Sequence, residues 1–162
     1  MSTVDVTHET PVEVPEQGTV YFKLEVVVLP VSDVDRAKRF YTSLGWREDA
    51  DFDISEAFRV LQFTPPGSTS SIIFGRGVTT ADAGPVQGLL LAVYDIDAAR
   101  AELVAHGIDV SEVFHATPFD RNAPRLSGRD PEGRPYFTMA SFRDPDGNEW
   151  LLQEIKTRLP GR

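Results

Sequence analysis

The fold of this chain is decided by VSDVDRAKRFYTSLGWREDADF at residues 31–52 and by VYDIDAARAELVAHGIDVSEVF at residues 93–114. Adding 62 to the numbering of the first stretch superposes it on the second with six identities: Val31/Val93, Asp33/Asp95, Asp35/Asp97, Ala37/Ala99, Gly45/Gly107 and Phe52/Phe114. The identities fall at the expected start of a helix and at the glycine after its end, where backbone geometry restricts the choice of residue. The chain therefore contains an internal repeat.

The first stretch has the pattern of an amphipathic helix, and the repeat extends this prediction to the second stretch. Ser32 followed by Asp35 resembles a capping box, and apolar residues recur at helical spacing as far as Leu44. Gly45 and Gly107 supply left-handed stops. We predict helices over 34–44 and 96–106.

A second correspondence, at an offset of 80, pairs TPPGSTSSIIF at 64–74 with DPDGNEWLLQE at 144–154. Turn residues followed by an apolar run predict a turn that leads into a strand. Each half then contains a strand, a helix and three strands, with the strands at 22–31, 46–53, 58–64 and 70–75, and at 87–94, 108–115, 135–143 and 148–155. The prediction is an α+β domain over 21–158, made of two pseudo-symmetric βαβββ modules at about 21–84 and 85–158.

The rise of the offset from 62 to 80 places 18 extra residues in the second half, within ATPFDRNAPRLSGRDPEGR at 116–134. This segment is rich in proline, glycine, arginine and aspartate, which predicts a long loop. We expect it to be a mobile cover over the cavity of the second module. The alternative is a disordered insertion with local ion pairs to Asp120 and Asp130.

Composition excludes several classes of protein. The 162 residues are 41% hydrophobic, carry a net charge of −9 and include no cysteine. These values exclude wholesale disorder, a disulfide framework and a thiol nucleophile. Because the acidic balance repels a phosphate backbone, we expect no nucleic-acid partner. Residues 1–20 are predicted to form a flexible tail or arm. The chain shows no signal peptide and no run of about 20 apolar residues, so we expect no membrane partner and a cytoplasmic location.

The two modules, the phrase LPVSDVDRAKRFYTSLGW and the closing SFRDPDGNEWLLQEI resemble the vicinal oxygen chelate superfamily over roughly residues 22–156. This family includes glyoxalase I, bleomycin-resistance proteins and extradiol dioxygenases. The resemblance implies that each module curls a sheet around a pocket and packs its helix on the outer face. It further implies that two modules, from one chain or across a homodimer, complete a cavity.

The metal ligands of the family fall on Val26, Ser71, Gly88 and Leu151. Valine, glycine and leucine offer no lone pair, and a neutral serine hydroxyl is a weak ligand for a divalent ion. A slip of one residue would substitute Glu25 and Gln87, but it would also turn the side chains to the opposite face of the sheet. We therefore expect no metal and no cofactor.

Period-two alternation predicts a mostly apolar cavity floor. The polar candidates are Ser71 and Gln153, while the facing of Arg59 and Gln62 stays unassigned, and His115 borders the long loop. The candidate ligand-binding residues are Val26, Val28, Ser71, Leu90, His115, Glu149, Leu151 and Gln153. The alternative is that many of these residues fill a core without any ligand.

Three functions fit this pattern. The first, which the absent metal ligands favour, is a metal-free protein that binds a small apolar or aromatic molecule. The second is a metal-dependent lyase, isomerase or dioxygenase. The third is a metal-free enzyme with Glu149 or His115 as an acid or base. The sequence identifies no catalytic residue.

Overall fold

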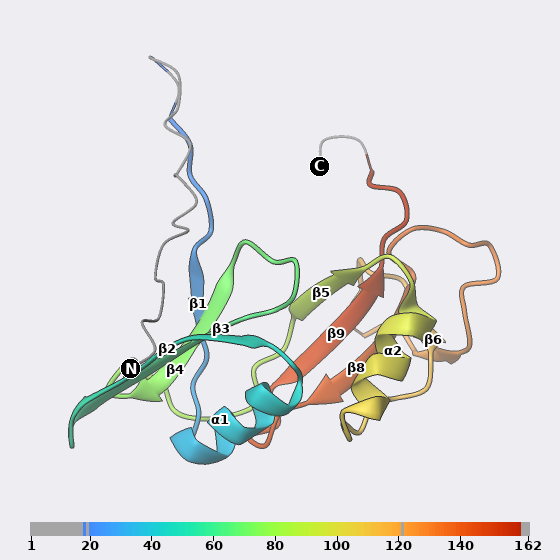
Figure 1. The fold of residues 1–162 in the computed structure, drawn as a ribbon. Helices are drawn as coiled ribbons and strands as arrows, with labels where there is room; N and C mark the ends of the chain where they lie inside the picture. Colours follow the sequence, from blue (N-terminus) through green and yellow to red (C-terminus); the bar gives the residue numbers. More distant parts are fainter. Residues whose placement is uncertain (1–17, 19, 121, 160–162) are drawn as a thin grey trace, which may run out of the picture.

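The computed structural model describes residues 18, 20–120 and 122–159, which form two sheets and two helices (Figure 1). The first module contains β1 (Val26–Val28), α1 (Val34–Ser43), β2 (Arg47–Ser55), β3 (Phe58–Thr64) and β4 (Ser71–Arg76). The second contains β5 (Leu89–Val93), α2 (Ile96–Ala105), β6 (Phe114–His115), β7 (Leu126–Ser127), β8 (Thr138–Arg143) and β9 (Glu149–Glu154). Apart from Gly18 and Val20, the predicted tail at 1–20 lies outside the described residues.

The two modules share one topology, which confirms the predicted repeat. The sheet of the first module has the order β1-β4-β3-β2, and that of the second has the order β5-β9-β8-β6-β7. In both modules the first and last strands pair in parallel and the other pairs are antiparallel. β7 is an addition from the long loop. No helix of the described part of the chain is long and apolar enough to cross a membrane.

The strand pairing corrects the predicted alignment of the first strands. Val26 pairs with Ser71 in the first module, and Leu90 pairs with Leu151 in the second. Leu90 therefore occupies the position of Val26, which the offset of 62 assigned to Gly88. The helix starts eight positions after Val26 in the first module and six positions after Leu90 in the second. This difference of two shifts the strand without changing which face a side chain occupies.

The helix starts also differ from the expected capping box. Asp33, not Ser32, is the N-cap of α1, and its carboxylate accepts the backbone N–H of Arg36 at 2.9 Å. Ser32 instead donates its hydroxyl to Asp146 in the second module. Asp95 caps α2 in the same way as Asp33 caps α1. Gly45 and Gly107 follow the helices with φ of 76° and 79°, as predicted.

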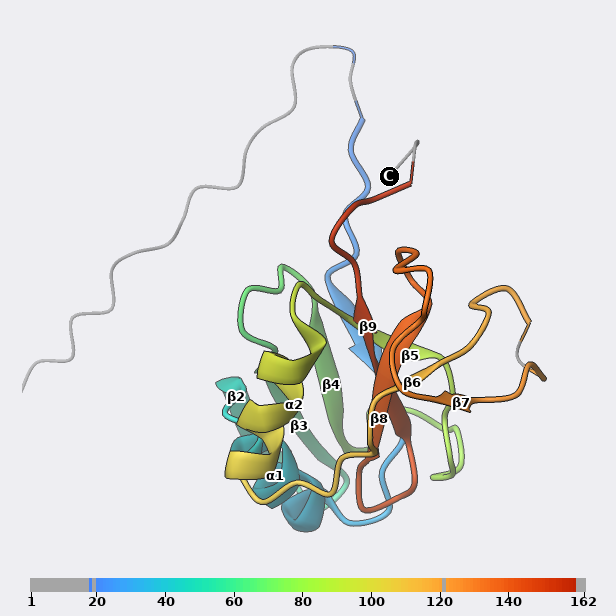
Figure 2. The same cartoon turned by 90° about the vertical axis from the view of Figure 1, so that its right-hand side faces the viewer.

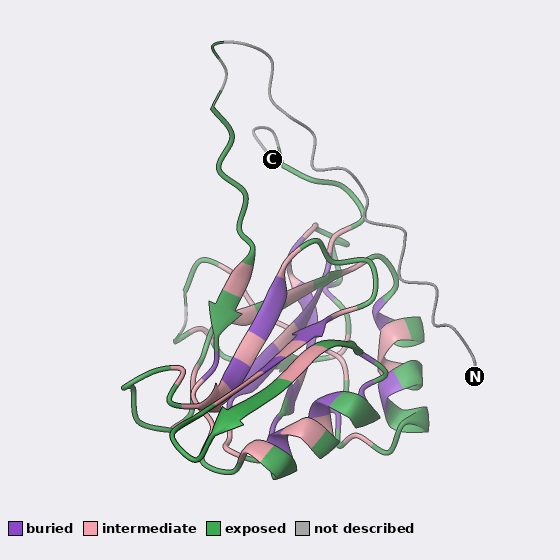
Figure 3. Cartoon of the chain, turned by 60° about the vertical axis from the view of Figure 1, so that its left-hand side comes forward, coloured by how far each residue is buried: buried purple, intermediate pink, exposed green. Residues whose placement is uncertain are grey.

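Both helices lie on the same side of the sheets (Figure 2), and the buried residues gather between helices and sheets (Figure 3). Tyr41 of α1 is fully buried, and its ring packs against Phe74 of the first sheet and Trp150 of the second. Its hydroxyl donates to Asp144 at 2.8 Å and accepts the Trp150 indole N–H at 3.1 Å. α1 thus joins the two modules within one chain.

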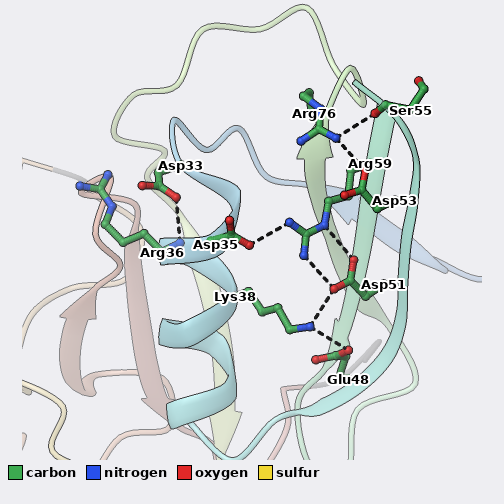
Figure 4. A network of polar contacts seen from close by, with 10 residues as sticks. All are labelled: Asp33, Asp35, Arg36, Lys38, Glu48, Asp51, Asp53, Ser55, Arg59 and Arg76. Carbon is green, nitrogen blue, oxygen red and sulfur yellow. Dashed lines mark hydrogen bonds and ion pairs between the residues drawn. The ribbon is translucent and has the colours of Figure 1, made fainter. Parts of the chain in front are cut away.

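Charged side chains fasten α1 to the first sheet (Figure 4). Arg59 donates to both carboxylate oxygens of Asp51 at 2.9 Å and to Asp35 of the helix at 2.8 Å. Lys38 of the helix reaches Asp51 at 2.7 Å, and the hydrogen bonds from Arg59 are the main reason why the pKa of Asp51 is lowered. Arg59 therefore faces the helix and does not lie on the open face of the sheet.

Candidate functional site

The face of the second sheet that is turned away from the helices holds a cavity of about 250 Å³. Alternation along β9 buries Trp150 and Leu152 in the core and turns the residues between them to the open face. Four predicted site residues line the cavity, namely Leu90, Glu149, Leu151 and Gln153. Glu149 and Gln153 are buried, and Leu90 is 54% exposed.

The other predicted site residues do not line this cavity. Val26, Val28 and Ser71 belong to the first sheet, where the Ser71 hydroxyl lies 2.6 Å from the Thr64 hydroxyl and 3.3 Å from the Gln62 amide nitrogen. His115 follows Phe114, which lines the cavity, so its side chain points to the opposite face. Its Nδ1 donates to the backbone carbonyl of Gly128 at 2.8 Å.

An ion pair closes one end of the cavity. Arg125 donates to the Glu149 carboxylate at 2.8 Å, and its guanidinium lies 4.7 Å from the centre of the Phe114 ring. Arg143 approaches the same carboxylate at 3.4 Å. Burial works to raise the pKa of Glu149, but the two arginines outweigh it and the pKa is lowered. The carboxylate is therefore ionised at neutral pH and already engaged.

The long loop has two parts. From this first part, the cavity is lined by Ala116, Thr117, Pro118, Asp120, Ala123 and Arg125. That the loop acts as a mobile cover stays a prediction. The following part carries β7 and is held by ion pairs, because Arg129 bridges Glu154 and Asp97 and Arg134 binds the buried Asp130. The expected pairing with Asp130 thus occurs at the base of the loop, while the first part lies on the cavity.

Three lining residues that decide the chemistry of the site were not among the predicted site residues. Phe114 and Met139 complete the apolar floor, and Arg125 supplies the charge that neutralises Glu149. Alternation along β6 and β8 carried the signal for the first two residues, because Phe114 and Met139 are paired across these strands. The position of Arg125 had no local signal, because it depends on how the loop folds back.

The donor set does not fit a divalent metal. By strand pairing, the four positions of the family's metal ligands hold Val26, Ser71, Leu90 and Leu151, which together offer one hydroxyl. Within residues 18, 20–120 and 122–159, no three histidine, aspartate or glutamate side chains gather in a way that could hold a metal ion.

This chain is similar to known proteins of one superfamily in both sequence and structure. The profile of the Glyoxalase/Bleomycin resistance protein/Dioxygenase superfamily matches residues 23–152. TnmS3, an antibiotic binding protein from Streptomyces sp. CB03234, is 29% identical with a TM-score of 0.61, over 85% of this chain and 98% of that chain. A glyoxalase/bleomycin resistance protein from the same strain is 30% identical with a TM-score of 0.58, over 82% and 100%.

A superfamily member from Sphaerobacter thermophilus DSM 20745 is 24% identical, with a TM-score of 0.59 over 83% of this chain and 98% of that chain. This likeness concerns the fold alone. A search of curated proteins found no match.

Proposed function

This chain belongs to the Glyoxalase/Bleomycin resistance protein/Dioxygenase superfamily, and from that premise we propose that it binds a small apolar or aromatic molecule without a metal. The observation that carries this proposal is the cavity over β9. Its floor is made by Leu90, Met139 and Leu151, with polar groups at both ends. A mostly apolar pocket with a few polar groups suits a small molecule. The similarity to TnmS3, described as an antibiotic binding protein, supports the same class.

The metal-free part of the proposal depends on the donor set. Leu90 and Leu151 stand beside each other where the resemblance would require two ligands. Neither can hold a divalent ion, and the neighbouring carboxylate of Glu149 is already bound by Arg125.

The states of Glu149 and His115 favour a binding protein over an enzyme that transfers protons. A general base works best with a pKa near the operating pH, whereas the pKa of Glu149 is lowered. His115, the other acid–base candidate, points to the opposite face of the sheet and donates to Gly128.

We propose further that the protein is a homodimer. The open face of the first sheet exposes large apolar side chains, with Phe52 at 59%, Ile54 at 69% and Phe58 at 39%. Exposed apolar groups gathered on one face are typical of an interaction surface. Sedimentation equilibrium is expected to give a mass near twice 18.0 kDa, and a monomer at tens of micromolar would refute this part. The cytoplasmic location stays a prediction.

Native mass spectrometry of the purified protein tests the proposed function. We expect the folded protein to carry an organic molecule of small mass, or to take one up from an added mixture of aromatic compounds, with no metal adduct. One metal ion per chain would contradict the proposal. Failure of every aromatic compound to bind would contradict it as well.

A further inference from the structure

Gln153 lies at the end of the cavity opposite the ion pair. It is 7% exposed, and its amide nitrogen donates to the backbone carbonyl of Tyr136 at 2.9 Å. A carbonyl only accepts hydrogen bonds, so the amide nitrogen has to face Tyr136 and the amide oxygen has to face away from it. Among the described residues, no backbone or side-chain donor bonds this oxygen.

The backbone of Tyr136 is held in an unusual conformation. Its φ of 74° lies in the left-handed region, and it is the one non-glycine among the described residues with positive φ. Two hydrogen bonds and the burial of the side chain maintain this conformation. The Tyr136 N–H donates to the carbonyl of Glu154 at 3.2 Å, its hydroxyl accepts the N–H of Leu159 at 3.2 Å, and its side chain is buried. Strained backbone of this kind persists where surrounding contacts impose it, and it concentrates at functional sites.

The two polar ends of the cavity are chemically different. Gln153 and Glu149 share one face of β9 with Leu151 between them, and strand geometry places their Cα atoms about 13 Å apart. The charge of Glu149 is taken by Arg125. Gln153 offers a neutral oxygen that is oriented by the bond to the Tyr136 carbonyl and that accepts no hydrogen bond from the described residues.

We propose that Gln153 is a specificity-determining residue that accepts a hydrogen bond from a hydroxyl or N–H group of the bound molecule, with the Tyr136 carbonyl as its positioning group. This inference rests on the proposed function, because it requires that the cavity binds a ligand. A bound molecule that covers this oxygen without donating to it leaves the acceptor unpaired, which costs binding free energy. The site therefore selects an apolar molecule that carries such a donor over one that lacks it.

Two probes of nearly equal size test this selection, 2-naphthol with a hydroxyl and 2-methylnaphthalene with a methyl group. Their dissociation constants are measured by calorimetry on the full-length protein and on Gln153→Met, which keeps the length of the side chain and removes the acceptor. The substitution is expected to weaken 2-naphthol binding about fivefold to tenfold, as loss of one hydrogen bond does, and to change 2-methylnaphthalene binding less than twofold.

Tyr136→Gly separates the backbone from the ring, since glycine adopts positive φ freely and keeps the carbonyl. We expect this variant to be less stable but to keep the preference of the wild type for 2-naphthol. Loss of the preference would overturn the positioning role of the carbonyl.

The outcomes distinguish this inference from the proposed function. If both probes bind and Gln153→Met weakens both equally or neither, the specificity role is wrong while the ligand cavity stands. If neither probe binds the wild-type protein, the proposed function fails and this inference fails with it.

Discussion

Replacing Arg125 by methionine tests the electrostatics of the cavity. The variant keeps an apolar stem over Phe114 and removes the guanidinium from Glu149. Breaking a buried ion pair costs ~3–5 kcal/mol and breaking an exposed one ~0–1 kcal/mol. The exposures of the two side chains, 46% for Arg125 and 11% for Glu149, place this pair between those limits. We expect Arg125→Met to lower the free energy of unfolding by about 1.5 kcal/mol through loss of the ion pair and by about 0.5 kcal/mol through loss of the cation–π contact.

The stability lost in Arg125→Met is expected to depend on pH. The pKa of folded Glu149 is lowered, so the ionised carboxylate adds stability above the pKa of the unfolded chain, about 4.3. That contribution disappears as the pH falls through the folded-state pKa. Without Arg125, Glu149 keeps Arg143 at 3.4 Å and its folded-state pKa rises. The difference in the free energy of unfolding between the wild type and Arg125→Met is therefore largest near pH 7 and smaller near pH 3.

Urea denaturation at both pH values measures this difference. Arg143→Met is the matched control, because it removes a 66% exposed arginine from the same carboxylate. We expect the control to cost less than about 0.5 kcal/mol near pH 7. An equal cost of Arg125→Met at both pH values, or a control that costs as much as Arg125→Met, would show that the ion pair between Arg125 and Glu149 does not stabilise the fold.

Three further variants test the fold, the loop and the dimer. Tyr41→Phe removes a donor from Asp144 and an acceptor from the Trp150 indole, so it should lower the free energy of unfolding by about 2–3 kcal/mol. A loss under about 0.5 kcal/mol in urea denaturation would argue against the buried link between the modules. Hydrogen bonds from Arg134 lower the pKa of Asp130 to about 2. The calorimetric Tm of Asp130→Asn should therefore fall below that of the wild type at pH 6, and the difference in Tm should close as the pH falls through about 2. A difference in Tm that does not change with pH would exclude this ion pair. Phe52→Asp, on the open face of the first sheet where Phe52 is 59% exposed, should weaken association in sedimentation experiments without altering the circular dichroism spectrum; an unchanged dimer would place the interface elsewhere.

The repeat and both helices could be predicted because their signals are local. Asp33 and Asp95 cap a first turn, and Gly45 and Gly107 take positive φ after the last one. These requirements act within a few residues, so they leave identities in the sequence that an offset can detect. The choice of Asp33 over Ser32 was missed, because Ser32 bonds a residue of the other module, and both helices end one residue earlier than predicted.

The register of the strands was less accessible. The helix starts share an offset of 62, but the strands pair so that Leu90 matches Val26. A spacing from strand to helix that differs by two residues leaves every side chain on its predicted face, and alternation alone therefore cannot detect it.

The candidate site was predictable in its floor and not in its charges. Alternation along β9 placed Glu149, Leu151 and Gln153 on one face, which the structure shows as the cavity lining. It could not show that Arg125 neutralises Glu149 or that Tyr136 orients Gln153, because both contacts join segments that are distant in sequence. His115 was placed at the cavity for its position beside the loop, yet its strand turns it to the other face.

Equilibrium titration of 2-methylnaphthalene into EDTA-dialysed protein tests the metal-free ligand cavity most directly. Wild-type protein and Val104→Trp, an exposed control on α2, are predicted to bind one probe per chain. Leu151→Trp is predicted to bind none, because the indole fills the cavity of about 250 Å³ that Leu151 lines. Binding that appears only after a divalent metal is added, or that is equal in Leu151→Trp and the wild type, would show that this cavity is not a metal-free ligand site.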